Sequence, residues 1–108
     1  MTEEDWNNYK QNSMYSPQSI EDQGFIHCST GEEIGETANR LFKGRDDVLL
    51  LIINSSIIDQ EIKYELDEDL GKKFPHIYGP INIRCIIDKI KLAPEADGSF
   101  DISFKIEH

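Results

Sequence analysis

The sequence is poor in basic residues, in cysteine and in long apolar runs, and each shortage excludes a class of protein. Eleven Lys and Arg against 21 Asp and Glu give a net charge of -10, which opposes binding along nucleic acid because phosphate contacts need basic side chains. The longest apolar run, Val48–Ile53, is far shorter than the roughly 20 residues that cross a membrane. Two cysteines are too few for a disulfide scaffold. We therefore expect neither long nucleic acid nor a membrane as a partner.

The length of 108 residues predicts one domain, spanning 1–108, because domains commonly hold about 100–150 residues. The N-terminal segment Met1–Trp6 is acidic and lacks the apolar core of a signal peptide. A cytoplasmic protein is therefore expected, with Cys28 and Cys85 as reduced thiols. A disulfide between these two cysteines is the alternative.

Helix signals occur in two places. Thr2 precedes three acidic residues and predicts a capped helix that ends near Asn12. Ser29 and Thr30 each stand three residues before a glutamate, which is the spacing of a capping box and predicts a second helix. Gly44 is expected to end that helix. Its core-facing stripe is expected to consist of four apolar residues at helical spacing: Ile34, Ala38, Leu41 and Phe42.

Strands are expected over much of the remaining chain. The run Val48–Ile53 predicts a strand covered on both faces, whereas Ile62–Glu65 and Phe100–Ile106 alternate and predict half-exposed strands. We further expect a loop at 13–23, a strand at 24–27, a loop at 66–73, a strand at 83–92 and a turn at 94–98. This order indicates an α+β fold with a mostly antiparallel sheet and two main helices.

Two polar segments, Gly24–Thr30 and Phe74–Pro80, carry the candidate chemistry. His27 ends the first expected strand, and an imidazole can donate, accept or ligate near neutral pH. Ser29 and Thr30, together with the free N–H groups of the expected helix, can bind an anion there. The alternative is that His27 is an ordinary core residue and that the two hydroxyls only cap the helix.

In the second segment, His76 and Tyr78 lie two residues apart and share one face of an extended chain. Pro75 on one side and a Gly-Pro pair on the other limit where the two side chains can point. A structural alternative is that both only bond loop carbonyls. Glu65, at the end of an expected strand, can act as an acid, a base or an electrostatic stabiliser. The acidic residues around it are expected to form a solvated rim.

Metal binding is not expected, because His27, His76 and Glu65 lack the short spacing typical of metal ligands. Cys28 lies beside an expected helix N-terminus, where a thiol can become reactive. Strand alternation places it opposite His27, however, and a buried apolar thiol is the favoured interpretation. The whole hypothesis requires that the segments around residues 27 and 76 meet in the folded chain.

These segments also carry a family resemblance. They occur in a fixed order and together resemble the small bacterial family known as domain of unknown function 952, over about 6–100: Gly24–Thr30, Thr37–Phe42, Tyr64–Glu65 and Phe74–Pro80. That family is grouped with the ADP-ribosyltransferase-like fold, which is a split antiparallel β-core with a cleft for a nicotinamide dinucleotide. The resemblance implies such a cleft between the two polar segments, with Glu65 at its edge and NAD as a ligand.

The leading hypothesis is a pocket that binds NAD or a nucleotide-like small molecule and supports ribosyl transfer or hydrolysis. Glu65 and His27 are the candidate catalytic residues, and the candidate ligand-binding residues are Ser29, Thr30, His76 and Tyr78. Two alternatives are a non-catalytic module that binds a metabolite or a protein, and a degenerate member without a ligand. Relatives carry an extra N-terminal strand, and a sheet edge left open in its absence would favour a homodimer.

Overall fold

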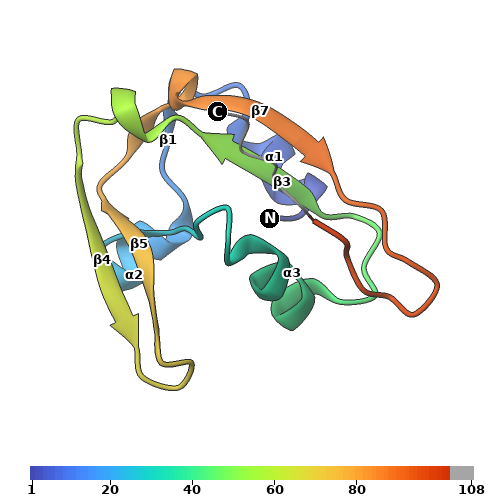
Figure 1. Ribbon diagram of the computed structural model, residues 1–108. Helices are drawn as coiled ribbons and strands as arrows, with labels where there is room; N and C mark the ends of the chain where they lie inside the picture. Colours follow the sequence, from blue (N-terminus) through green and yellow to red (C-terminus); the bar gives the residue numbers. More distant parts are fainter. Residues whose placement is uncertain (103–108) are drawn as a thin grey trace, which may run out of the picture.

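The structure, a computed structural model, describes residues 1–102 and shows an α+β fold with antiparallel ladders, as predicted (Figure 1). The helices are α1 (Glu3–Tyr9), α2 (Gln18–Gln23) and α3 (Ile34–Phe42), with 3-10 turns η1 (Ser55–Ile57) and η2 (Ile83–Cys85). The strands are β1 (Met14–Tyr15), β2 (Ile26–His27), β3 (Leu49–Ile53), β4 (Glu61–Asp67), β5 (Lys72–Tyr78), β6 (Ile81–Asn82) and β7 (Ile86–Lys91). Within residues 1–102, no helix has the length and apolar character needed to span a bilayer.

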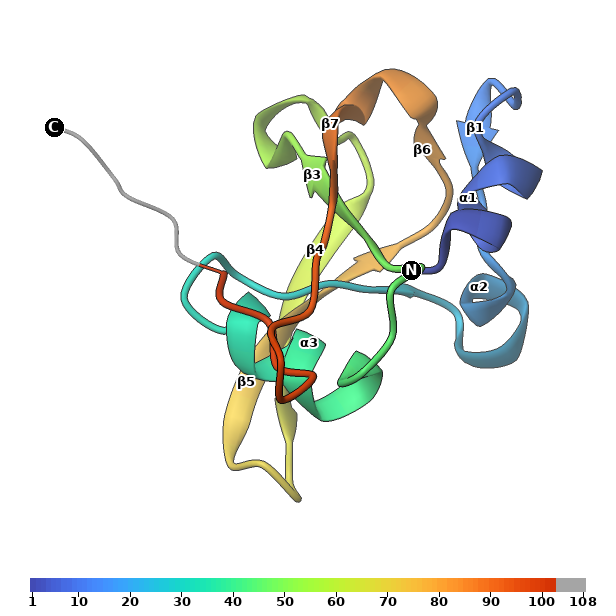
Figure 2. The ribbon, with the colours of Figure 1, turned by 90° about the vertical axis from the view of Figure 1, so that its right-hand side faces the viewer.

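The strands form three separate antiparallel groups. β5 lies between β2 and β4, β3 pairs with β7, and β1 pairs with β6. Figures 1 and 2 show the β4–β5 hairpin and the β3–β7 pair as distinct arms, with α1 beside the second arm. Backbone bonds join α1 to that arm, because Glu3 N–H donates to Asp47 and Leu49 N–H donates to Met1.

The two arms rest on two apolar clusters. The first lies under β2 and β5 and contains five buried residues: Tyr15, Ile26, Ile77, Ile81 and Cys85. The second joins α3 to the segments before β3 and after β7, and contains Ala38, Val48, Leu92 and Phe100. Burial of apolar surface is the main stabilising contribution in a chain of this size, so the first arm depends on buried residues of β2 and β5, and the second on buried residues that flank β3 and β7.

Local signals explain α1 well. The Thr2 hydroxyl accepts a hydrogen bond from Asp5 N–H at 3.2 Å, and three acidic residues occupy the first turn. These contacts satisfy one free N–H and complement the helix dipole. Trp6 is the buried residue of this helix. The predicted start is therefore confirmed, although the helix ends at Tyr9 rather than near Asn12.

The loop predicted at 13–23 is wrong, because this segment contains β1 and α2. Pro17 occupies the N-cap of α2, where the fixed φ of proline suits a helix start and its missing N–H costs little. Gly24 ends the helix with φ of +89°, and its N–H donates to Ile20 and Ser19. This left-handed residue is best supplied by glycine, and it turns the chain into β2.

The predicted start of the second main helix is also wrong, because α3 begins at Ile34. The Thr30 carbonyl accepts from the N–H groups of Glu33 and Ile34, so residues 31–33 form a turn before the helix. The apolar stripe is confirmed for Ala38, which is buried, but Leu41 is 56% exposed. Gly44 has the expected left-handed φ, at +84°.

Several strand predictions need correction. β3 is half-buried along its whole length, so it is not covered on both faces. β4 and β5 extend into the predicted 66–73 loop, and β7 begins only at Ile86, after η2. Residues 100–102 form no strand, because Phe100 instead enters the second apolar cluster. The rest of the strand predicted at Phe100–Ile106 lies outside the described residues.

Pro75 lies inside β5, the middle strand of its group, where proline is unusual because it lacks a ladder donor. Its carbonyl accepts from Cys28 N–H at 3.1 Å, on the β2 side. The N–H and C=O groups of a strand residue point to the same side, so the missing donor also faces β2. β2 accordingly ends at His27, one residue before Cys28.

Candidate functional site

Pairing of β2 with β5 brings the two polar segments together. His27 lies directly opposite His76 in the ladder, and their ring centroids are 5.3 Å apart. The expectation that the segments around residues 27 and 76 meet is therefore confirmed. Their neighbours Ile26 and Ile77 are also paired and face the first apolar cluster, so alternation sends both imidazoles to the opposite face of the strands.

Phe25 lies at the centre of this face. Its ring stacks on His76 with centroids 4.1 Å apart and planes 16° apart, and it lies 4.8 Å from His27 and 5.2 Å from Tyr78. We call the set Phe25, His27, Glu65, His76 and Tyr78 the imidazole cluster. Sequence reasoning did not select Phe25 as a site residue, although its spacing of two residues from His27 places both on one face.

Glu65 joins the cluster from β4. Its Oε1 accepts hydrogen bonds from the Tyr78 hydroxyl and from His76 Nδ1, the latter at 3.1 Å. The His76 side chain is 16% exposed and that of Glu65 is 40% exposed. The ammonium group of Lys63 lies 5.0 Å from the centre of the Tyr78 ring. The carboxylate is thus held by two donors at a partly open edge.

These contacts set the charge of each group. The bonds from Tyr78 and His76 hold the pKa of Glu65 below its usual range, because they stabilise the carboxylate. The same bond to Glu65 raises the pKa of Tyr78. Burial, followed by the neighbouring His76, lowers the pKa of His27. At neutral pH the site therefore contains an anionic Glu65, a protonated Tyr78 and a neutral His27, and Glu65 does not fit the role of acid.

Gln23 fixes the His27 ring from the last position of α2. Its side-chain oxygen contacts His27 Nε2, and with that oxygen as the acceptor the ring proton lies on Nε2. Nδ1 of the neutral ring is then an acceptor. Sequence reasoning missed Gln23, because it lay in a predicted loop. Gln23 is the last residue of α2, and the turn at Gly24 brings the chain back so that the Gln23 side chain contacts His27, four residues later.

Ser29 and Thr30 do not join the cluster through any contact within residues 1–102. Ser29 donates instead to the hydroxyl of Thr37 on α3, at 3.1 Å. Neither hydroxyl caps α3, whose first residue comes later and whose N-cap, Glu33, makes no side-chain capping bond. The helix N-terminus expected at these two residues is therefore wrong, since it lies beyond a further turn, and anion binding by Ser29 and Thr30 stays a prediction.

Cys28 lies on the core side, packed against the first apolar cluster. Burial raises the pKa of its thiol to about 11, which opposes a reactive thiolate, although Cys28 is half-buried rather than buried. Cys28 and Cys85 are both free, which rules out the alternative of a disulfide between them in this structure. Among residues 1–102, no group of three or more His, Cys, Asp or Glu side chains is placed to hold a metal ion.

The α+β fold is shared with solved structures. The crystal structure of protein CC0527 from Caulobacter crescentus is 29% identical, with a TM-score of 0.79, covering 94% of this chain and 89% of that chain. A double mutant of CC0527 gives a TM-score of 0.78 at the same identity and coverage. The solution NMR structure of CC0527 gives 0.77 at 28% identity, covering 92% and 85%.

The family follows from a match over most of the chain. Residues 1–89 match the family described as protein of unknown function (DUF952), and the chain belongs to this family. A comparison with curated proteins found none that matches. The predicted family is therefore confirmed, and the chemistry must be argued from the imidazole cluster itself.

Proposed function

We propose that the imidazole cluster binds the ribose-bearing part of NAD or a similar nucleotide and supports ribosyl transfer or hydrolysis. The observation that carries this proposal is the Glu65 carboxylate, which two donors hold in its ionised form at a partly open edge. Cleavage of a glycosidic bond passes through an oxocarbenium-like centre with positive charge. A positioned anion stabilises that charge more in the transition state than in the substrate.

The other members of the cluster supply binding groups. His27 presents a neutral ring whose Nδ1 can accept a hydrogen bond from a ribose hydroxyl, and its lowered pKa keeps that acceptor available near pH 7. Phe25 and Tyr78 supply aromatic surface beside the two imidazoles. We also propose that the chain has the ADP-ribosyltransferase-like fold, which would agree with NAD as the ligand.

A second candidate is a non-catalytic binding module on the same face. It is favoured by one observation, namely that the polar groups of the cluster already bond one another through Glu65. Such a closed set can hold β4 against β5 without any reaction. A module of this kind binds a ligand through Phe25 and the imidazoles, and Glu65 then has only a structural role.

A thermal-shift series with NAD, ADP-ribose and ATP tests the proposal, combined with an assay for released nicotinamide. NAD is expected to raise the Tm, and His27→Ala is expected to remove most of that rise. Glu65→Gln keeps the shape of the side chain and should spare the shift while reducing nicotinamide release by about 100-fold or more. Tyr64→Phe, which alters the neighbouring exposed residue of β4, is the matched control and should change neither readout.

The outcomes separate the candidates. A shift with NAD but no release of nicotinamide by the unmodified protein supports the binding module and contradicts catalysis. Release that survives Glu65→Gln at full rate contradicts the role given to this carboxylate. If no nucleotide of the series shifts the Tm, the nucleotide assignment is wrong.

A further inference from the structure

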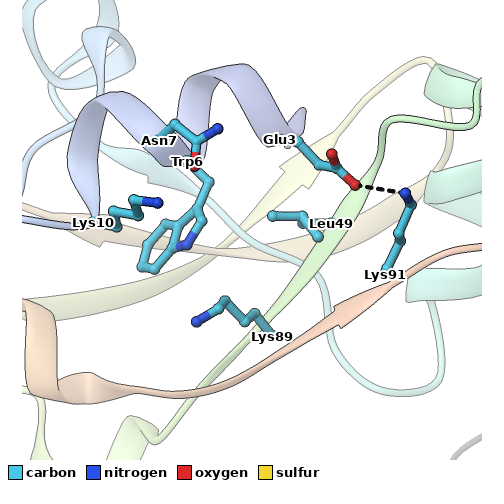
Figure 3. A pocket seen from close by; sticks show the side chains of 7 residues that line it. All are labelled: Glu3, Trp6, Asn7, Lys10, Leu49, Lys89 and Lys91. Carbon is cyan, nitrogen blue, oxygen red and sulfur yellow. Dashed lines mark ion pairs between the residues drawn. The ribbon is translucent and has the colours of Figure 1, made fainter.

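A cavity of about 300 Å³ lies between α1, β3 and β7, on the arm that does not carry the imidazole cluster. Figure 3 shows that its walls include Trp6 from α1, Lys10 from the C-cap of that helix, Leu49 from β3, and Lys89 and Lys91 from β7. We call this cavity the lysine pocket. Its volume lies at the lower end of the range of about 300–1,000 Å³ that small-molecule sites occupy.

The charge of the lysine pocket is opposite to that of the chain. The protein carries -10 overall, yet three of its eleven basic residues line this one cavity. The acidic residue of the lining is Glu3, which pairs with Lys91 at 3.1 Å. Three ammonium groups and one carboxylate leave a charge of about +2. Within residues 1–102, no carboxylate lies within 4.0 Å of the ammonium groups of Lys10 or Lys89.

Trp6 adds a buried polar group without a partner. The residue is 7% exposed, and its indole Nε1 is the one buried side-chain nitrogen or oxygen atom within residues 1–102 that makes no hydrogen bond. Figure 3 shows the indole between Lys10 and Lys89, with its nitrogen toward the side of Leu49 and Lys89. The Lys89 ammonium group lies 5.7 Å from the ring centre. Buried donors are normally satisfied, so an orphan donor in a cavity wall points to a ligand.

We propose that the lysine pocket binds a small organic phosphate monoester. A phosphate monoester carries about -1.5 to -2 charge at pH 7 and accepts hydrogen bonds through three oxygens, which matches the charge of the lining. Lysines bind phosphate as mobile point charges, whereas planar carboxylates are better matched by the arginine fork, and the lining has no arginine.

The binding geometry follows from the positions of these groups. Lys10 and Lys89 approach the phosphate. A side-chain movement in the cavity wall brings the indole N–H, which is buried in the free protein, within reach of a phosphate oxygen, to which it donates. Leu49 and the indole face contact the organic part of the ligand. The site uses α1, β3 and β7 rather than β2, β4 and β5, so it stands independently of the function proposed for the imidazole cluster.

Trp6 is the single tryptophan of the chain, and its fluorescence reports on the pocket directly. We expect phenyl phosphate to change this fluorescence in a saturable way, and added salt to weaken the binding. Inorganic phosphate tests the organic part of the assignment and should bind at least about fivefold more weakly. Benzoate has the ring without the phosphate and should bind about tenfold more weakly or not at all.

Two substitutions locate the site. Lys10→Gln and Lys89→Gln change exposed side chains and should each raise the Kd for phenyl phosphate by about tenfold. Lys73→Gln, an exposed lysine of β5, removes the same charge elsewhere and should leave the Kd unchanged. His27→Ala and Glu65→Gln should also leave it unchanged, which separates this site from the imidazole cluster.

Four results would overturn the assignment. Fluorescence that does not saturate with phenyl phosphate contradicts a site, and equal weakening by Lys73→Gln shows a general charge effect. Equal affinity for inorganic phosphate or benzoate contradicts the ligand class. Circular dichroism and thermal melting of each variant check that the fold is kept. A folded Lys89→Gln variant that binds phenyl phosphate with unchanged Kd also contradicts the proposal.

Discussion

The imidazole cluster and the lysine pocket use their polar groups in opposite ways. In the cluster, Glu65 accepts from Tyr78 and His76, and Gln23 bonds His27. In the pocket, the Trp6 N–H has no partner within residues 1–102, and two of the three ammonium groups have no carboxylate nearby there. Polar groups that already bond one another have their charge states set before a ligand binds, whereas groups without partners remain available to bond a ligand.

The two regions also differ in how they are supported. The cluster lies on the reverse side of β2 and β5, whose other side is the first apolar cluster. The lysine pocket lies between the short helix α1 and the β3–β7 pair. Trp6 is the buried residue of α1, and the residues of β3 and β7 are half-buried or exposed. We therefore expect the cluster to depend on the stability of the core, and the pocket to tolerate substitution.

The largest expected effect compares how much a core substitution beneath the cluster and one in the pocket wall lower the free energy of unfolding. Ile77 is 3% exposed beneath the cluster, and Ile77→Ala should lower the free energy of unfolding by about 2–5 kcal/mol, through lost burial and a cavity. Leu49 is only half-buried in the pocket wall, so Leu49→Ala should lower it by clearly less. Urea unfolding followed by circular dichroism measures both. A larger loss for Leu49→Ala would reverse the comparison.

The second prediction concerns acid. Because burial and His76 lower the pKa of His27 from the usual 6.5, the unfolded chain takes up this proton before the folded protein does. The contribution of His27 to the free energy of unfolding is therefore fully present above about pH 6.5, and it is lost as the pH falls through the pKa of the folded state. Melting temperatures measured from about pH 7.5 to about pH 5 should show this fall.

Two variants test whether the fall in melting temperature at low pH comes from the imidazole cluster or from the lysine pocket. His27→Gln removes the titrating ring and should flatten the profile below about pH 6.5. Lys10→Gln, in the lysine pocket, should leave the profile as it is in the unmodified protein. A profile that keeps its full slope in His27→Gln would mean that another group controls the acid response.

The smallest expected effect is a shift in one carboxyl group. Tyr78→Phe removes the donor that contributes most to the lowered pKa of Glu65, so this pKa should rise toward the usual 4.5. An NMR titration of the Glu65 side-chain carboxyl measures the change. Tyr64→Phe removes the hydroxyl of the neighbouring exposed tyrosine and should not move the pKa. An unchanged pKa in Tyr78→Phe would show that the network is not closed as described.

Local sequence signals predicted the elements whose causes are local. Thr2 and the acids after it determine the start of α1, and alternation of residues determines β4. The same kind of signal failed at Ser29 and Thr30, where the spacing to a glutamate is correct but a turn intervenes before α3. Pro17 was interpreted as a loop residue although it starts α2. Short segments of this kind take their structure from tertiary packing as much as from propensity.

The candidate site was predicted in part because its two segments have the same apolar-to-polar pattern. His27, His76, Glu65 and Tyr78 lie together as the hypothesis requires, whereas Phe25 and Gln23 were missed. The position of Gln23 depends on α2, which was not predicted. The lysine pocket had no sequence signal, since its residues come from three separate parts of the chain. They meet through the pairing of β3 with β7 and through the backbone bonds of Met1 and Glu3 to the segment around β3.

Pro75 has a consequence for how the cluster can respond to a ligand. Because it offers no donor toward β2, the histidine pair is the last full pair of the ladder, and beyond it one hydrogen bond, from Cys28 N–H to the Pro75 carbonyl, joins the two segments. Strand pairing beside the histidines is therefore complete toward Ile26 and Ile77 and reduced toward Pro75. Phe25 contacts both rings, stacked on His76 and edge-on to His27. A flat ligand could therefore separate β2 from β5 at the histidine pair, while the longer pairing of β4 with β5 stays intact.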